Sequence, residues 1–160
     1  MHHMGVTPDK VIATLQKEPY KNPDWWEDDE RLEAQLDRPL GVEERLRLKE
    51  LLYGQCARTR QPRKIGHLIE MWRHVVQSVA GDYCFDQYEY AASLGWRSEL
   101  EGLVEQLPAP LKGDVRRVLD AIDSEFRSLT VVVEKPILPR PNTTLGWWEY
   151  RLPRKGATWL

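Results

Sequence analysis

Apolar side chains between residues 65 and 79 recur at the spacing of an α-helix. They stand three or four positions apart, so they form one stripe on a helical surface. The stripe consists of Ile65, Leu68, Ile69, Trp72, Val75, Val76 and Val79, and Gly81 follows where such a helix can end. A stripe this wide has to be covered by other elements. The sequence therefore predicts a buried helix at the centre of a helical core.

Similar patterns predict helices through most of the chain up to residue 130. We expect an all-α, single-domain bundle of about six helices over residues 7–130, and the apolar fraction of 41% suffices for one core. The part of the chain from Asp86 onward is predicted to form two successive helices. A helix starting at Asp86 is expected to end at a turn near Gly95, before a Ser98-x-x-Glu101 capping box opens the next helix.

The two ends of the chain differ from its middle. Residues 1–6 are interpreted as a remnant of expression and a disordered start. Residues 131–160 begin with β-branched side chains and contain four prolines, which exclude helix from most of this stretch. We expect a Pro/Trp-rich C-terminal arm packed on the bundle, either extended or folded as a short β-hairpin of residues 130–138 with 147–152.

Seven tryptophans occur in these 160 residues, and four of them form the doublets Trp25-Trp26 and Trp147-Trp148. Neighbouring side chains point about 100° apart on a helix and to opposite faces of a strand. One buried stripe therefore cannot hold both rings of a doublet. The second ring has to pack elsewhere in the molecule or contact a partner.

The segment from Asp24 to Glu33 places tryptophan among six acidic residues and one basic residue. On a helical wheel Trp25 aligns with the leucines, whereas Trp26 points toward carboxylates. We define the acidic-aromatic surface as Trp26, Asp28, Asp29, Glu30 and Glu33, together with Tyr83, Asp86 and Tyr90 from a second patch. Aromatic rings bordered by carboxylates are typical of sites that bind a basic protein. The alternative is that the rings pack within the fold and the acids form a solvated face.

This surface predicts a non-enzymatic protein-binding module. We expect a bacterial immunity or antitoxin-type inhibitor that occludes a basic toxin, for example a nuclease, by occupying the lysines and arginines that hold nucleic acid. The likeness to nuclease-inhibiting immunity proteins is one of size, acidity and aromatic content. It is an analogy, because no family motif is present.

Two other functions remain open. One is a small-ligand-binding or regulatory domain in which the C-terminal arm closes a pocket, with Trp147, Trp148 and Tyr150 as walls. The other is a metal-dependent enzyme built on three residues of one predicted helix, His67, Glu70 and His74. Their spacing is not that of a His-Glu-x-x-His site, and their face lies opposite the apolar stripe. A solvated face is favoured there, and we expect no cofactor.

Composition and charge also limit the classes of partner that we expect. The net charge of −2 lacks the basic footprint of a nucleic-acid-binding protein, although four basic residues cluster at positions 58–64. No apolar run reaches the roughly 18 residues of a membrane span. The two cysteines form no disulfide framework. We therefore expect a cytoplasmic protein that binds neither membrane nor nucleic acid.

Overall fold

The computed structural model describes residues 25–59, 64–81, 86–137 and 145–154. These residues form a bundle of five α-helices with a small antiparallel hairpin, which confirms the predicted fold class. The helices are α2 Trp25–Leu36, α3 Val42–Thr59, α4 Ile65–Ala80, α5 Gln87–Val104 and α6 Ala109–Leu129. The strands are β1 Thr130–Val132 and β2 Arg151–Pro153, and the short 3₁₀ helix η1 Trp147–Tyr150 precedes β2.

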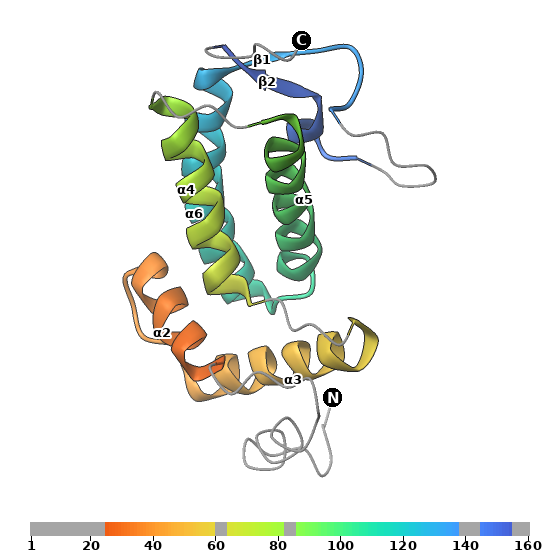
Figure 1. Cartoon of the computed structure of the whole chain (residues 1–160). Helices are drawn as coiled ribbons and strands as arrows, with labels where there is room; N and C mark the ends of the chain where they lie inside the picture. The colour runs from red at the N-terminus through yellow and green to blue at the C-terminus, as the bar shows by residue number, and fades with distance from the viewer. Residues whose placement is uncertain (1–24, 60–63, 82–85, 138–144, 155–160) are drawn as a thin grey trace.

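Helices α4, α5 and α6 run side by side and form the body of the bundle (Figure 1). Helices α2 and α3 lie toward one end of this body, and the β1–β2 hairpin covers the other end. Helix α2 contacts both α4 and α6, and η1 contacts α5. The core therefore lies between α4, α5 and α6 and continues under the C-terminal arm.

The predicted central helix is confirmed as α4. Every residue of its apolar stripe is buried. Trp72 is 1% exposed and packs on Phe126 of α6, with ring centroids 4.8 Å apart. The aromatic contact between two helices shows why the stripe ends up inside the bundle.

The connection from α2 to α3 is held by one arginine. Asp37 adopts φ 56° and directly follows Leu36, the last residue of α2. Arg38 then donates hydrogen bonds of 2.8 Å to both carboxylate oxygens of Glu44 and one of 2.9 Å to Asp114 of α6. These bonds lower the pKa of Glu44. They join the start of α3 to α6.

The turn expected near Gly95 is absent, because α5 is one continuous helix. Its start is as predicted, since the Asp86 carboxylate accepts a 2.8 Å hydrogen bond from the Glu89 amide. The expected capping box at Ser98 does not form. The Ser98 hydroxyl donates to the Leu94 carbonyl one turn earlier, and Glu101 binds arginines instead. Tertiary ion pairs thus replace the local cap.

The C-terminal arm folds back as a hairpin, one of the two predicted forms. Val131 of β1 lies opposite Leu152 of β2. The doublet Trp147-Trp148 lies in η1 rather than in a strand, so the hairpin is shorter than expected. No helix within the described ranges combines the length and apolar character that a membrane crossing requires.

Candidate functional site

Asp28 was predicted to lie on the acidic-aromatic surface, but its side chain is buried and binds the start of α4. It is 4% exposed. Its carboxylate accepts hydrogen bonds from the amides of Gly66 (3.1 Å) and His67 (2.7 Å) and so caps the start of α4. Burial raises the pKa of Asp28, and the two amides oppose that rise. Asp28 is therefore a structural cap contributed by another helix.

Asp29 is also internal, at 2% exposure. It pairs with the buried ammonium of Lys49 on α3, and Arg45 lies 3.8 Å from the same carboxylate. Burial raises the pKa of Asp29 and lowers that of Lys49. This pair joins α2 to α3, so Asp29 is not displayed to a partner.

The other two acidic residues predicted on α2 differ in their surroundings. Glu33 accepts hydrogen bonds from the Leu40 amide (2.7 Å) and from Arg45 (3.0 Å), whereas Glu30 is exposed. The side chain of Trp26 lies outside the described part of the chain. The α2 half of the acidic-aromatic surface therefore retains Glu30 as its exposed carboxylate.

The second patch of the acidic-aromatic surface also differs from its prediction. Tyr90 is fully buried, and its hydroxyl donates a 2.6 Å hydrogen bond to the Arg151 carbonyl of β2. Burial raises the pKa of this phenol. Tyr83 lies outside the described residues, and Asp86 caps α5. Among the described residues of this patch, Tyr88 is the exposed aromatic, at 81%.

The residues considered for a metal do not form a site. His67 and His74 are exposed, and Arg31 lies 3.4 Å from Nδ1 of His67 and 3.8 Å from Glu70. In the residues that the structure describes, no group of three or more His, Cys, Asp or Glu side chains could hold a metal ion. The polar face of α4 is thus partly engaged by an arginine of α2.

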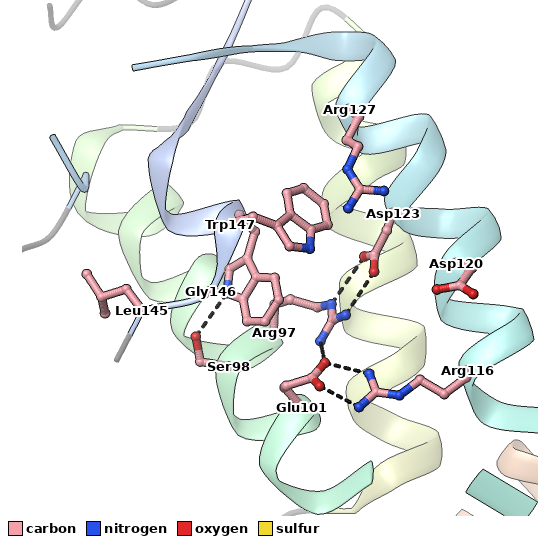
Figure 2. A pocket seen from close by; sticks show the side chains of 11 residues that line it. Arg97, Ser98, Glu101, Arg116, Asp120, Asp123, Arg127, Leu145, Gly146 and Trp147 are labelled. Carbon is pink, nitrogen blue, oxygen red and sulfur yellow. Dashed lines mark hydrogen bonds and ion pairs between the residues drawn. The ribbon is translucent and has the colours of Figure 1, made fainter. Parts of the chain in front are cut away.

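A pocket of about 440 Å³ opens between α5, α6 and the C-terminal arm (Figure 2). Its lining is Arg97, Ser98 and Glu101 from α5, Arg116, Asp120, Asp123 and Arg127 from α6, and Leu145, Gly146, Trp147 and Trp148 from the arm. Two of the three predicted pocket walls, Trp147 and Trp148, are therefore in place. Tyr150 does not line the pocket.

Paired charges form the inner side of this pocket. Arg97, 2% exposed, donates to both oxygens of Asp123 (3.1 and 2.8 Å) and to Glu101 (2.9 Å). Arg116 donates to both oxygens of Glu101, at 2.7 and 2.5 Å. These arginines lower the pKa of Glu101 to about 2. Figure 2 shows this chain of alternating charges running from α5 to α6.

The Trp147-Trp148 doublet forms the side of the pocket that the C-terminal arm contributes, in contact with two of the arginines. Trp148 is 5% exposed, and its indole N–H donates a 2.9 Å hydrogen bond to Ser98 while the guanidinium of Arg97 lies 4.3 Å from its ring centroid. A side chain at Gly146 would overlap the Trp148 ring, so only glycine fits there. Trp147 packs between Phe126, at 6.1 Å, and Arg127, at 3.8 Å.

The polar lining of this pocket was not predicted from the sequence. Its signal was a stripe on α6 in which Arg116, Asp120, Asp123 and Arg127 recur every three or four positions. Such a stripe is typical of a solvated helix face. Only the arm, placed over it by the hairpin, turns it into the wall of a pocket.

Comparison with known proteins found no relative of this chain. No family model, no curated protein and no solved structure matches this chain.

Proposed function

We propose that this chain is a binding protein whose small organic ligand occupies the pocket between α5, α6 and the C-terminal arm. The observation that carries the proposal is a pocket of about 440 Å³ walled by two tryptophans and three arginines. This volume falls within the range of small-molecule sites, about 300–1,000 Å³. The indoles offer apolar area, and the arginines offer a few directed polar contacts.

The paired charges support this proposal because they make the pocket rigid before any ligand arrives. Arg97, Asp123 and Glu101 already satisfy one another, so a ligand meets a preformed surface. A preformed site loses less entropy on binding than one that must be ordered. The same chain of bonds fixes α5 against α6, which keeps the width of the pocket constant.

A thermal-shift screen of small organic compounds against the full chain tests the proposal. Compounds that bind the native state are expected to raise the melting temperature, and the rise should grow with the logarithm of ligand concentration once that concentration exceeds the Kd. The rise should disappear in Trp147→Ala and persist in Tyr150→Phe, since Tyr150 lies outside the pocket. The proposal is wrong if no compound stabilises the protein, or if the compounds that do so act equally on Trp147→Ala.

A second candidate, also proposed, is the immunity or antitoxin-type inhibitor of a basic toxin. It is supported by the 81% exposure of Tyr88, which stands beside Asp86 at the start of α5, and by the exposed carboxylate of Glu30 on α2. Aromatic anchors near carboxylates suit a basic protein surface.

This candidate predicts that Tyr88→Ala, Trp26→Ala and Glu30→Lys each weaken binding to a toxin encoded beside this chain. Glu125→Lys, an exposed acid of α6, is the matched control for charge reversal. Unchanged affinity in all three test variants would remove the inhibitor from consideration.

A further inference from the structure

Arg127 differs from the other two arginines of the pocket. Arg97 and Arg116 are bonded to carboxylates, whereas the guanidinium of Arg127 lies 3.8 Å from the centroid of the Trp147 ring. No carboxylate within the described ranges pairs with Arg127, and its side chain is exposed. In Figure 2 it lies at the end of the pocket beside Trp147. Its hydrogen-bond donors are thus available to a ligand.

Two further arginines stand near this end of the pocket. Arg151 donates a 3.0 Å hydrogen bond to the Arg127 carbonyl, and the Arg154 amide donates one of 3.1 Å to Leu129. Burial and the charges of Arg127 and Arg154 lower the pKa of Arg151. In the part of the chain that the structure describes, none of the three has an acidic partner. The hairpin end of the pocket therefore carries concentrated positive charge.

We infer that the ligand of this pocket is an organic anion whose carboxylate or phosphate group binds the guanidinium of Arg127. The inference rests on the proposed function and specifies its ligand class. A guanidinium stacked on an indole keeps its edge available for two parallel hydrogen bonds to an anion. Stacking also limits the rotamers of the side chain, which reduces the entropy lost on binding.

Asp120 gives the anion one orientation. It lines the pocket seven residues before Arg127 on the same helix, about 10 Å away along the helix axis. Its exposed carboxylate repels an anionic group and accepts hydrogen bonds from a neutral or cationic one. The acidic group of the ligand is therefore directed to the hairpin end, and the apolar body lies along Trp147 and Trp148.

Titration of the full chain with four matched six-carbon probes tests this inference. The probes are hexanoate, hexyl phosphate, hexanamide and hexylamine, followed by calorimetry and tryptophan fluorescence. At least one of the two anions is expected to bind about tenfold or more tightly than hexanamide, the gain of one charge-assisted hydrogen bond. Comparing the two anions distinguishes a carboxylate ligand from a phosphate ligand.

Variants of two arginines on α6 locate the effect. Arg127→Gln should abolish the preference for the anion, and Arg127→Lys should restore part of it, because lysine keeps the charge but not the fork of donors. Arg117→Gln is the control, since Arg117 is 80% exposed and lies outside the pocket. Urea unfolding of each variant verifies that it remains folded.

The outcomes separate this inference from the proposed function. Equal affinity for hexanoate, hexyl phosphate and hexanamide, with binding still lost in Trp147→Ala, overturns the anion inference and leaves the ligand pocket standing. Anion binding that persists in Arg127→Gln also overturns it. If none of the four probes binds, the inference fails, and the compound screen decides separately whether the pocket binds any ligand.

Discussion

Arg97 of α5 holds both carboxylate oxygens of Asp123 of α6 in the interior of the bundle. Its Nε lies 3.1 Å from Oδ1 and its Nη2 lies 2.8 Å from Oδ2. The residues are 2% and 4% exposed. Trp72 of α4 donates a third hydrogen bond of 2.9 Å to Oδ1. Three helices therefore meet at one carboxylate, and each of its oxygens is satisfied.

Removing the arginine should be costly. Arg97→Ala leaves the charge of Asp123 buried without its partner, so we expect a loss of about 3–5 kcal/mol in the free energy of unfolding. Urea denaturation followed by circular dichroism measures this loss. Arg117→Ala on the exposed side of α6 should change stability by less than about 0.5 kcal/mol. Similar values for the two variants would show that the buried pair does not hold α5 to α6.

Gly66 is required by the close approach of α2 to α4. A Cβ at this position would lie 2.8 Å from the Asp28 carbonyl oxygen and 2.8 Å from the Leu32 nitrogen. Gly66→Ala is therefore expected to destabilise by about 1–3 kcal/mol, the usual cost of overpacking. Gly113→Ala in α6 meets nothing within 4 Å and should stabilise by about 0.5–1 kcal/mol. Thermal unfolding compares the two; equal effects would contradict the close packing.

Two tyrosines two positions apart on α5 should respond differently to loss of the hydroxyl. Tyr90→Phe removes the hydrogen bond to the Arg151 carbonyl, and we expect a loss of about 1 kcal/mol. Tyr88→Phe should have no measurable effect, because that ring is 81% exposed. Denaturant unfolding checks both. If Tyr90→Phe left the free energy of unfolding unchanged, the stability of the hairpin would not depend on this hydrogen bond.

Acid should weaken the contact between α5 and α6 through Glu101. Its folded-state pKa of about 2 lies below the ordinary value of 4.5, so the fold favours the charged form. The resulting stability is complete above pH 4.5 and is lost as pH falls from 4.5 toward 2. Glu101→Gln cannot titrate, so its stability should fall less steeply across this window. The measurement is the urea midpoint against pH, with Glu125→Gln following the native curve.

The helices could be predicted where their signals are local. The apolar stripe of α4 and the Asp86 cap of α5 both depend on residues within one or two turns, and both agree with the structure. The turn expected near Gly95 was wrong because Glu101 finds partners in Arg97 and Arg116 rather than in a cap. Arg116 is 15 residues away, beyond the reach of a local pattern.

The candidate site was less predictable for the same physical reason. Asp28 finds its amide partners 38 and 39 residues along the chain, and Tyr90 finds its carbonyl 61 residues along it. An acidic or aromatic residue looks alike in sequence whether it faces solvent or a distant backbone group. Trp147 and Trp148 could be predicted as pocket walls because their Pro-rich segment contains no amphipathic α-helix that would bury the two rings. The α6 stripe was not, since it resembles a solvated face.

The Asp28 cap makes the beginning of α4 dependent on α2. Lys64, which precedes α4, forms no side-chain cap, so the amides of Gly66 and His67 are protected by another helix. We therefore expect exchange of these two amides with deuterated solvent to report the free energy of detaching α2 from α4. On this expectation, helix α2 and the first turn of α4 open together as one cooperative unit. Two amide protons report on its opening separately from the unfolding of the rest of the bundle.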